Sequence, residues 1–503
     1  MILERRLHLA GEAGISLASW RVASLGTMQS VASAITRLSD LAASPHISRL
    51  SAAFSAAGFE LALVGGPVRD AFLGRTLNDL DFATNARPDQ TLRLVKPISD
   101  AHWDIGRAFG TIGARIDGHT VEITTYRTDA YDGETRKPIV EFGDSLDEDL
   151  VRRDFTINAM ALRLPEKVLV DPSGGMADLL GRRITTPGAP EASFGDDPLR
   201  MLRAARFTSQ LGFTVAESTA RAMHEMADRI SIISVERIGD EVAKLLRTDS
   251  PRAGIELLVS SGLAALVLPE LPELRLEIDE HHHHKDVYEH TLTVLEQAIE
   301  LEKLRFDAEA QPDLVLRMAA LLHDIGKPAT KRTEPGGVVT FHHHDVVGAK
   351  LATRRLKALR FDNQFISDVS KLIELHLRFF GYTEGAWTDS AVRRYVRDAG
   401  PLLDRLNILV RADVTTRNRR KADRLGFAYD DLEQRIASLG AEEELAAIRP
   451  DLDGAQIMEI LGLTPGPMVG EAYRFMLEVR LDEGILGVEL ATSRLREWWA
   501  DRA

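Results

Sequence analysis

A change in the spacing of apolar residues near residue 190 divides this chain into two kinds of structure. Before that point, short apolar runs alternate with turn residues, and strands are expected over 61–64, 77–83, 111–115 and 120–126. A helix is expected over 46–58. After residue 190 helical spacing dominates, as in 199–211, 235–246 and 253–266. The sequence therefore predicts an α+β fold, with a small mixed sheet first and a mostly helical remainder.

The length of 503 residues exceeds what one hydrophobic core normally supports, so several domains are expected. Pro269 and Pro272 mark a linker near 268–280, and Pro465-Gly466-Pro467 interrupts the last helical stretch. We expect five regions: a poorly ordered extension over 1–45, a head over 46–165, a neck over 166–267, a histidine-rich region over 268–425 and a helical tail over 426–503.

Composition limits the chemistry. The chain has no cysteine, so a metal must bind to Asp, Glu or His, and a reducing, cytoplasmic setting fits. No apolar run approaches the roughly 20 residues that a membrane span needs, and a secretory signal is not expected. The net charge of −14 argues mildly against a nucleic-acid partner. Metal-binding carboxylates and local basic patches are compatible with such a charge, so it does not decide the matter.

Two aspartates stand close together in the second expected strand. Asp79 and Asp81 are two positions apart, so both side chains point to the same face of the sheet. Neighbouring carboxylates repel each other unless a cation bridges them. Oxygen ligands suit Mg²⁺, which in two-metal sites holds the attacking and leaving oxygens of an in-line displacement. The pair is a candidate catalytic site, although an Asp-x-Asp alone is also common on surfaces.

The surroundings of the pair strengthen this interpretation. Upstream, a buried strand ends at Gly65-Gly66 and Pro67 opens a helix, so backbone N–H groups and a positive helix end can face a triphosphate. Downstream, Glu122 lies between two apolar strand residues and is a candidate third carboxylate. The alternatives are an ordinary strand-to-helix turn and a solvated strand residue.

With these features in place, the run LVGGPVRDAFLG followed by LNDLDFAT resembles the signature of the polymerase-β-like nucleotidyltransferases, in the class that contains bacterial tRNA CCA-adding enzymes and poly(A) polymerases. Four further segments follow in the order of that family: RRDFTINAM over 152–160, DPSGG over 171–175, DDPLR over 196–200 and VERIGDEVAKLL over 235–246. The resemblance implies a polymerase-β-like head followed by a helical neck. The DPSGG segment is equally compatible with a simple structural turn.

The resemblance also assigns roles to residues. It implies that Asp79 and Asp81 form the catalytic pair that holds Mg²⁺, and Glu122 is the candidate third carboxylate of this catalytic set. The residues implied in nucleotide binding are Gly65, Gly66, Arg69, Arg153, Asp154, Asn158, Asp197, Arg200, Arg203 and Arg206.

Within that set the roles differ. By resemblance, Arg153, Asp154 and Asn158 surround the sugar and triphosphate, which agrees with guanidinium chemistry for phosphate and amide or carboxylate chemistry for a hydroxyl. Asp197 and Arg200 would read the base of CTP or ATP. The family usually has Glu where this chain has Asp196. The alternative for Arg203 and Arg206 is pairing with neighbouring acids.

The choice of nucleotide depends on another segment. YDGETRKP over 131–138 resembles the flexible loop that family members need for the switch from C to A, with Asp132 and Arg136 as its working residues. The resemblance therefore favours addition of complete CCA, with poly(A) polymerase and partial (CC or A) addition as alternatives.

The second half contains scattered histidines and an adjacent His-Asp pair. His323-Asp324, with single histidines on separate helices, resembles the HD phosphohydrolase superfamily. The resemblance implies that one or two divalent metals, a transition metal or Mg²⁺, are held by His290, His323, Asp324, His344, His376 and Asp413. Secondary phosphohydrolase activity is one expectation, and a degenerate HD domain with a structural role is the other. The runs His281–His284 and His342-His343 remain ambiguous.

These patterns predict a transferase with an accessory HD domain, acting on tRNA with CTP and ATP and without a membrane. A less favoured hypothesis is an HD phosphohydrolase whose amino-terminal half only binds RNA. The retention of both Asp79 and Asp81 argues against it. The basic stretch RNRRKADR over 417–424 is expected either to contact tRNA or to form a solvated helix face.

Overall fold

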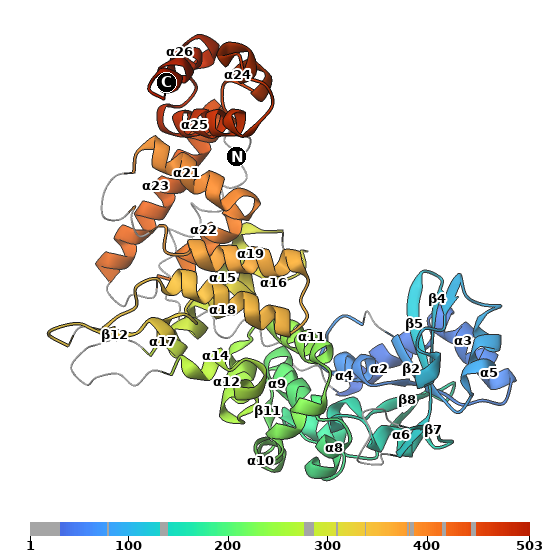
Figure 1. Cartoon of the computed structure of the whole chain (residues 1–503). Helices are drawn as coiled ribbons and strands as arrows, with labels where there is room; N and C mark the ends of the chain where they lie inside the picture. The colour runs from blue at the N-terminus through green and yellow to red at the C-terminus, as the bar shows by residue number, and fades with distance from the viewer. Residues whose placement is uncertain are drawn as a thin grey trace. The chain divides into compact units, whose positions relative to one another are not determined.

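The computed structural model describes residues 31–77, 80–130, 139–275, 286–307, 310–337, 339–379, 382, 387–414, 419–443 and 449–502. The chain separates into two compact units (Figure 1). The first contains residues up to Ile233 together with Glu256–Leu263, and the second contains Ser234–Ile255 and Ala264–Ala503. Each unit is described by itself.

The first unit is built on a seven-stranded mixed sheet with strand order β3-β4-β5-β2-β1-β8-β9. Its strands are β1 (Leu61–Val64), β2 (Leu80–Thr84), β3 (Ala101–Trp103), β4 (Thr111–Ile116), β5 (His119–Thr125), β8 (Ala161–Leu164) and β9 (Val168–Val170). All neighbouring strands are antiparallel except β2 and β5, which run parallel. The expected mixed sheet is confirmed, and β9 carries it beyond the head boundary expected at residue 165.

Helices cover the sheet because its inner face is apolar. Leu80 and Phe82 of β2 and Val121 and Ile123 of β5 are all buried. The helices of this part are α3 (Pro45–Ala56), α4 (Gly66–Phe72), α5 (Pro88–Val95) and α6 (Leu146–Val151), with 3₁₀ turns η2 (Arg107–Phe109) and η3 (Thr156–Asn158). Helix α5 packs on β4 and β5, and α3 packs on β1 and on α5 (Figure 1). A separate hairpin joins β6 (Arg127–Ala130) to β7 (Ile139–Phe142).

Two expectations for this part need correction. The strand expected from residue 77 begins at Leu80 among the described residues, and Asp79 lies outside them. The poorly ordered extension expected through residue 45 is wrong for its last third, where Val31–Ala42 forms helix α2. Leu38 is buried on this helix, and Arg37 donates a 2.7 Å hydrogen bond to the carbonyl oxygen of Arg75. Tertiary contacts therefore order the end of a segment that was expected to be poorly ordered.

The rest of the first unit is helical, with α7 (Gly175–Leu180), α8 (Pro190–Asp196), α9 (Leu199–Leu211), α10 (Glu217–Glu225) and η4 (Ala227–Ile232), and one parallel pair of β10 (Arg183–Ile184) and β11 (Thr214–Val215). Helix α9 has the bounds that the sequence predicts. It ends at Gly212, whose φ of 69° is left-handed, a conformation that glycine adopts without steric cost.

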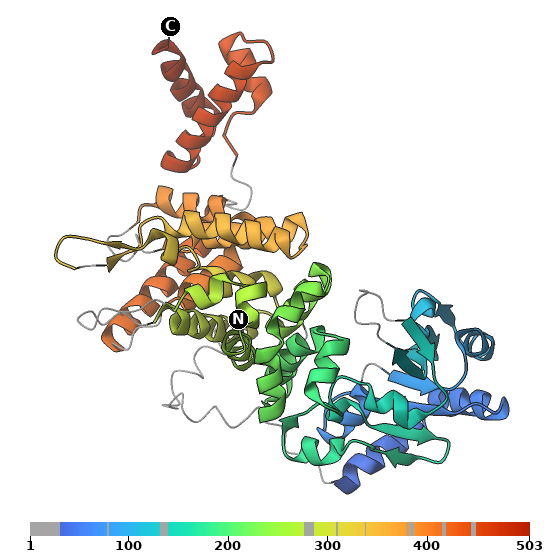
Figure 2. The same ribbon diagram turned by 60° about the horizontal axis from the view of Figure 1, so that its bottom comes forward.

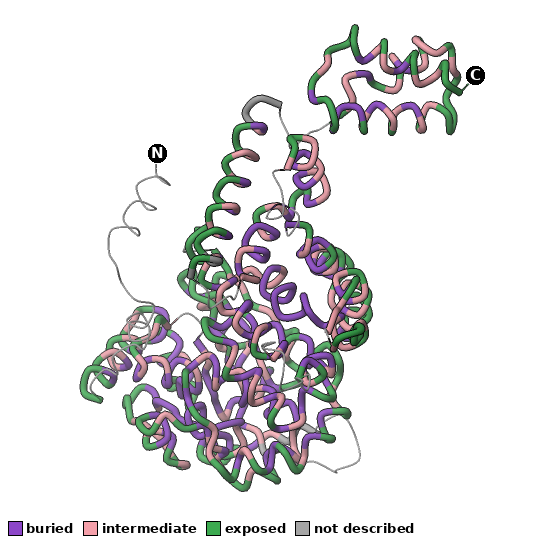
Figure 3. The backbone as a smooth tube through the Cα atoms, turned by 90° about the vertical axis from the view of Figure 1, so that its left-hand side faces the viewer, coloured by how far each residue is buried: buried purple, intermediate pink, exposed green. Residues whose placement is uncertain are grey.

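The second unit is helical in its described residues, apart from the short hairpin β12 (Arg332–Thr333) and β13 (Val339–Thr340). Its helices are α11 (Val235–Leu246), α14 (Glu270–Glu273), α15 (Val287–Arg305), α16 (Leu314–Leu322), α17 (Lys327–Thr330), α18 (His344–Ala358), α19 (Asn363–Leu375), α21 (Asp389–Ala399), η5 (Gly400–Leu402), α22 (Leu403–Ala412) and α23 (Arg419–Glu443). Helices α18 and α19 lie side by side (Figure 2). Buried and exposed residues alternate along the helices, as in amphipathic helices that pack on a core (Figure 3).

Three sequence expectations differ from the helices observed here. The single helix expected over 253–266 is two helices, α12 (Arg252–Ser260) and α13 (Leu263–Val267), because Gly262 takes a φ of 84° between them. The linker expected from residue 268 contains α14, whose Leu271 is buried. Helix α23 crosses the boundary expected at 425/426.

The tail consists of α24 (Gly454–Leu461), α25 (Pro467–Glu483) and α26 (Gly487–Ala500), which enclose a small core of their own. Helix α25 also packs against α21, where Arg394 pairs with Glu478 and Asp482. No described helix has the length and apolar character required to cross a membrane.

Candidate active site and metal centre

Two carboxylates lie opposite each other in the sheet of the first unit. Asp81 on β2 is in register with Glu122 on the parallel strand β5. Residues paired in this way point to the same face, and neighbouring strands are about 4.8 Å apart. Glu122 is exposed and Asp81 is half-buried, whereas the residues on either side of them face the core. The structure therefore brings together the two described members of the expected catalytic set.

The turn between β1 and α4 lies on the other side of β2. Gly65 has φ 72° and ψ −123°, a conformation essentially restricted to glycine. A Cβ at this position would lie 3.1 Å from Nη1 of Arg153, so the guanidinium of Arg153 lies directly over the turn. Arg153 is held by a 3.2 Å ion pair with Asp149, and its buried Nε lacks a hydrogen-bond partner among the described atoms. Helix α4 also begins here, so a cation and a helix amino terminus face the same space.

A chain of hydrogen bonds joins three of the expected nucleotide-binding segments. The buried Arg69 on α4 donates a 2.5 Å hydrogen bond to Oδ1 of Asn158. Nδ2 of Asn158 donates to Oδ1 of Asp154 at 3.0 Å. Nε and Nη2 of Arg203 on α9 donate to Oδ2 of Asp154 at 2.8 and 2.6 Å. These four residues, far apart in sequence, form one continuous polar network.

The charge of Asp154 is fixed by this network. Burial by itself raises the pKa of this carboxyl, but the positive charge of Arg203 and the hydrogen bonds from Asn158, Arg203 and the backbone of Phe155 lower the pKa to about 2. The pKa of Asp149 is also held below its ordinary value, because Arg153 and Arg152 outweigh its burial. Both carboxylates are therefore ionised at neutral pH.

The two residues expected to read a base lie at the junction of α8 and α9: Asp197 follows α8, and Arg200 is in the first turn of α9. Arg200 is buried, and it donates hydrogen bonds to Oγ of Ser193 at 2.8 Å and to the carbonyl oxygen of Arg152 at 2.6 Å. Asp197 accepts a 3.1 Å hydrogen bond from the N–H of Leu199. Arg200 is thus anchored on both sides, and the base-reading role remains a prediction.

The other two arginines of this helix differ from each other. Arg203 pairs with an acid, which is the alternative that the sequence left open. Arg206 donates a 2.8 Å hydrogen bond to Gln210, and its guanidinium lies 4.2 Å from the centre of the Phe207 ring. The structural reading of the turn over 171–175 is also supported, since Asp171 accepts hydrogen bonds from the N–H groups of Gly175 and Met176.

Sequence reasoning missed Asp149, which forms ion pairs with both Arg152 and Arg153. Its spacing of three and four residues before the arginine pair is the signal that could have identified it. Asp132 and Arg136 of the expected flexible loop lie outside the described residues, as does the run His281–His284.

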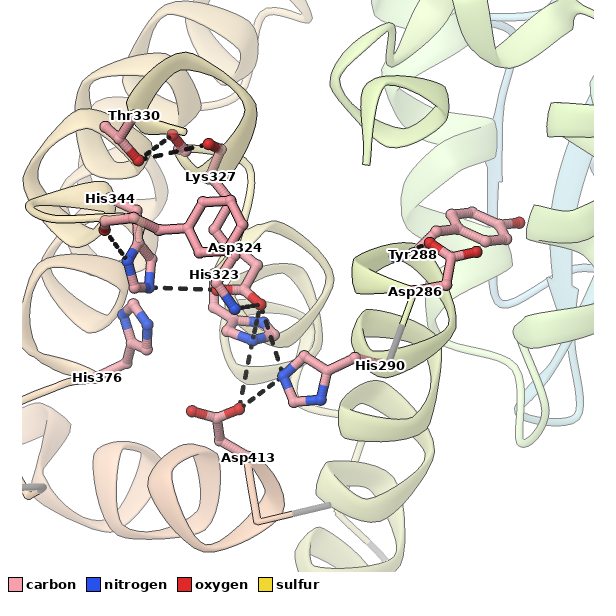
Figure 4. A network of polar contacts seen from close by, with 12 residues as sticks. Asp286, Tyr288, His290, His323, Asp324, Lys327, Thr330, His344, His376 and Asp413 are labelled. Carbon is pink, nitrogen blue, oxygen red and sulfur yellow. Dashed lines mark hydrogen bonds and ion pairs between the residues drawn. The ribbon is translucent and has the colours of Figure 1, made fainter. Parts of the chain in front are cut away.

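In the second unit, the six residues of the expected HD set converge on one point (Figure 4). His290 is on α15, His344 opens α18, and three ligands stand at the carboxyl ends of helices: His323 after α16, His376 after α19 and Asp413 after α22. The negative end of a helix attracts cations. The ligand atoms form two groups with separations of at most 4.8 Å: His290, His323 and Asp413, and Asp324, His344 and His376.

The tautomers of the histidines fit a bound cation. Nδ1 of His323, His344 and His376 lies 2.6–2.9 Å from a backbone carbonyl oxygen, which can only accept, so each Nδ1 carries the proton. Each Nε2 then presents a lone pair to the centre. Nε2 of His323 lies 3.3 Å from Oδ2 of Asp324 and 3.6 Å from Oδ1 of Asp413, and the buried Nε2 of His376 has no hydrogen-bond partner among the described atoms. Such lone pairs repel the facing oxygens unless a cation or a proton lies between them.

The pKa values of His323 and His376 also indicate that this centre favours a positive charge. Burial lowers the pKa of His323, but Asp324 and Asp413 raise it more, to about 10, so a positive charge is favoured there even without metal. The pKa of His376 is lowered to about 4 by burial and by the charge of His323, so this histidine stays neutral and keeps its lone pair. The donor set therefore fits one or two divalent metal ions.

Backbone packing explains the glycines of this region. A Cβ on Gly326 would lie 2.1 Å from the carbonyl oxygen of His344, so only glycine allows α18 to approach the His323-Asp324 segment. Lys327, which the sequence analysis did not select, donates a 2.6 Å hydrogen bond to Asp324. His342 and His343 are exposed and do not belong to either ligand group.

Comparison with known proteins identifies three families along the chain. Residues 61–185 match the family described as "Poly A polymerase head domain", residues 212–274 match "Probable RNA and SrmB- binding site of polymerase A", and residues 287–418 match "HD domain". An A-adding tRNA nucleotidyltransferase of Deinococcus radiodurans is 35% identical over 451 residues, which are 88% of this chain and 95% of that protein. The chain belongs to the tRNA nucleotidyltransferase family.

Other members of the tRNA nucleotidyltransferase family match a shorter part. The CCA-adding enzyme of Bacillus subtilis is 44% identical over 208 residues, 41% of this chain and 51% of that protein, so the chain spans about half the length of these relatives. A crystal structure of the Bacillus stearothermophilus CCA-adding enzyme with CTP is similar at a TM-score of 0.66 and 25% identity, covering 91% of this chain and 99% of that one. The expected α+β fold with a nucleotidyltransferase head and an HD region is thereby confirmed.

Proposed function

We propose that this tRNA nucleotidyltransferase adds CCA to the 3′ end of tRNA, using CTP and ATP. The observation that carries the proposal is the in-register pair of Asp81 and Glu122, one strand away from the Gly65 turn under Arg153. A triphosphate bound at the turn would place its α-phosphorus beside the carboxylates. A tRNA substrate would place the reaction in the cytoplasm.

Each residue of this site has its own role in the proposed nucleotidyl transfer. The 3′ hydroxyl of the RNA attacks the α-phosphorus, a new P–O bond forms, the bond to the bridging oxygen breaks and pyrophosphate leaves. Asp81 and Glu122, with Asp79 from the sequence pattern, would hold Mg²⁺ and orient the attacking hydroxyl. Arg153 would bind the phosphates, and Asp154 and Asn158 the sugar. When bound, the metal neutralises the charge that develops on the phosphoryl oxygens.

The polar network then has a positioning role. Arg203 fixes Asp154, and Arg69 fixes Asn158 from α4, whose amino terminus is the turn itself. Sugar and phosphate recognition are therefore coupled through short hydrogen bonds. Asp197, just before α9, and Arg200, in its first turn, are the candidates for reading cytosine and adenine edges.

One observation favours a second candidate, the addition of A alone to a tRNA that already ends in CC. A relative whose sequence matches 88% of the chain is named for A addition, whereas the sequence of the Bacillus subtilis CCA-adding enzyme matches over about half of its length. Both reactions use the same carboxylates and differ only in the nucleotides accepted, so the product decides between them.

We also propose a secondary phosphohydrolase activity in the HD region. Its support is the convergence of four histidines and two aspartates on one point. The Nε2 atoms of His323, His344 and His376 are oriented to coordinate a cation there. The metal bound there would supply a Lewis acid for cleavage of a phosphoester. Metal-dependent release of phosphate by wild-type protein, lost in His323→Ala, would support this activity. Equal release by both proteins would contradict it.

The transfer reaction is tested with tRNA that lacks CCA or ends in CC, Mg²⁺, and CTP and ATP separately and together. Extension of the first tRNA by two C and one A is expected. Extension by A of only the CC-ending tRNA would establish the second candidate, and long A tails would establish a poly(A) polymerase.

Variants tie the activity to the site. Asp81→Asn and Glu122→Gln are expected to lower kcat by about 100-fold or more. Each variant removes a carboxylate charge that would hold the metal ion beside the reacting phosphate. Asp104→Asn is the control, because this carboxylate is exposed in the same unit and forms a 3.7 Å ion pair with the exposed Arg107. Absence of extension by wild-type protein, or equal rates in Asp81→Asn and wild type, would overturn the proposal.

A further inference from the structure

Four strands of the head sheet place one residue each in a continuous row. Asp81 on β2 pairs with Glu122 on β5, Glu122 pairs with Gly113 on β4, and Gly113 pairs with Trp103 on the edge strand β3. Paired residues share a face of the sheet, so Trp103 lies on the face of the carboxylates, two strands from Glu122.

The indole of Trp103 reaches back toward the carboxylates. A Cβ on Gly113 would lie 1.9 Å from Nε1 and 2.1 Å from Cε2 of Trp103, so the five-membered ring occupies the space over Gly113. Any larger residue at position 113 would displace the indole from this place. One strand spacing, about 4.8 Å, separates Gly113 from Glu122. Trp103 is half-buried, so its ring is an aromatic surface at the border of the proposed active site.

The position of the Trp103 ring relative to the Gly65 turn indicates which of the two substrates, the nucleotide or the RNA, lies beside the ring. In an in-line displacement the attacking and leaving oxygens lie on opposite sides of the phosphorus. The Gly65 turn follows β1, on one side of β2, whereas Glu122, Gly113 and Trp103 follow one another on the opposite side. If the triphosphate lies at the turn, the RNA that supplies the 3′ hydroxyl approaches from the side of Trp103.

We propose that the indole of Trp103 is the stacking surface for the 3′-terminal base of the acceptor RNA. This inference rests on the proposed function. Stacking suits an acceptor end whose last base changes during addition, because every base has an aromatic face. Trp103 is thus a positioning residue, which sets the 3′ hydroxyl against the carboxylates through the base.

A cation stands on the same face. Arg115 is two residues from Gly113 on β4, so it points to the same side of the sheet, and it pairs with Ala101 on β3. Its side chain is exposed. A guanidinium beside an aromatic surface is the combination that binds single-stranded nucleic acid, the ring holding a base and the cation a phosphate.

The test compares Trp103→Leu, which keeps an apolar cover on Gly113 but cannot stack, with Trp103→Phe, which restores an aromatic ring. Initial rates are measured with varied tRNA at saturating CTP, and with varied CTP at saturating tRNA. We expect Trp103→Leu to raise the KM for tRNA about 10-fold with an unchanged KM for CTP, and Trp103→Phe to restore most of the affinity. His102→Ala is the matched control, because His102 is exposed on the same strand and points to the other face.

A second measurement does not depend on activity. A short single-stranded RNA is expected to quench tryptophan fluorescence in wild type, and the quenching is expected to be lost in Trp103→Phe. An unchanged KM for tRNA together with equal quenching would overturn the inference, and so would a raised KM for CTP, which would assign the indole to the incoming nucleotide. Wild-type protein that extends no tRNA would overturn the proposed function instead, while the quenching would still decide whether Trp103 binds RNA.

Discussion

Arg203 donates two hydrogen bonds, at 2.8 and 2.6 Å, to the same oxygen of Asp154, a residue 49 positions earlier in the chain. The other oxygen of Asp154 accepts from Asn158 and from the backbone of Phe155. A buried carboxylate with this many donors stays ionised and fixed in orientation. The pair joins the segment of the head that is expected to bind the sugar to helix α9, which carries Arg200.

Arg203→Ala is expected to destabilise the protein by about 2 kcal/mol, because it leaves a buried charge with fewer donors. The KM for CTP and ATP should rise in parallel, since Asp154 loses its fixed orientation. Thermal unfolding and steady-state kinetics measure the two effects. Arg221→Ala is the control, because Arg221 is an exposed arginine in α10 of the same unit. Similar losses in both variants would contradict a specific role for the pair.

The same carboxylate predicts an acid limit of stability. The folded pKa of Asp154 is about 2, below the ordinary value of 3.8, so the ionised form stabilises the folded state above pH 4. That contribution, about 2 kcal/mol, is lost as the pH falls from about 4 to about 2. The difference in unfolding temperature between wild type and Asp154→Asn should therefore be constant above pH 5 and shrink over this window. A difference that stays constant down to pH 2 would refute the assignment.

The turn over which Arg153 lies provides a sharp comparison between two glycines. Gly65→Ala and Gly58→Ala both place a side chain at positive φ, 72° and 78°, but only the Cβ at Gly65 meets Arg153, at 3.1 Å, while nothing lies within 4 Å at Gly58. Both variants should lose some stability. Only Gly65→Ala should lose nucleotide affinity, at least 10-fold by titration with CTP. Equal affinity for CTP in the two variants would contradict binding of the triphosphate at the Gly65 turn.

Helix α2 is expected to stabilise the first unit. Leu38 is 1% exposed and Ile35 is 47% exposed on the same helix. Leu38→Ala should cost about 2–4 kcal/mol, and Ile35→Ala less than about 1 kcal/mol, because only the first removes buried apolar contacts. Chemical denaturation of both variants measures the difference. Two equal and small effects would show that residues 31–42 do not contribute to the folded unit.

In the HD region, His376→Ala should lower the amount of divalent metal that copurifies or is taken up in equilibrium dialysis. The reason is that His376 carries a buried lone pair, whereas His342 is exposed outside both ligand groups, so His342→Ala should bind metal as wild type does. Metal content is measured by elemental analysis. Loss of metal in both variants, or in neither, would contradict the assigned ligand set.

Several strands, turns and helix bounds of this protein could be predicted from local sequence patterns. The run Leu61–Val64 followed by two glycines predicted both the strand and its turn, and α9 and α11 have the bounds that their spacing indicated. These features depend on neighbouring residues: alternation sets a strand, a 3.6-residue period sets a helix, and glycine permits a positive φ. The six HD residues were predicted differently, from their residue types and from the resemblance to the HD phosphohydrolases.

Other features depend on contacts that no local pattern contains. Residues 31–42 were expected to belong to a poorly ordered extension, yet they form a helix on which Leu38 is buried and Arg37 is hydrogen-bonded to Arg75. The pairing of Asp154 with Arg203 and the position of Trp103 over Gly113 are set by strand order and helix packing, which join positions tens of residues apart.

The sequence by itself therefore determined which chemical groups are present: carboxylates for a transfer site, and histidines and aspartates for a metal. Only the tertiary structure decided their partners. Asp81 faces Glu122 because β2 and β5 are parallel neighbours in one register, and a shift of one residue would turn either side chain to the other face of the sheet.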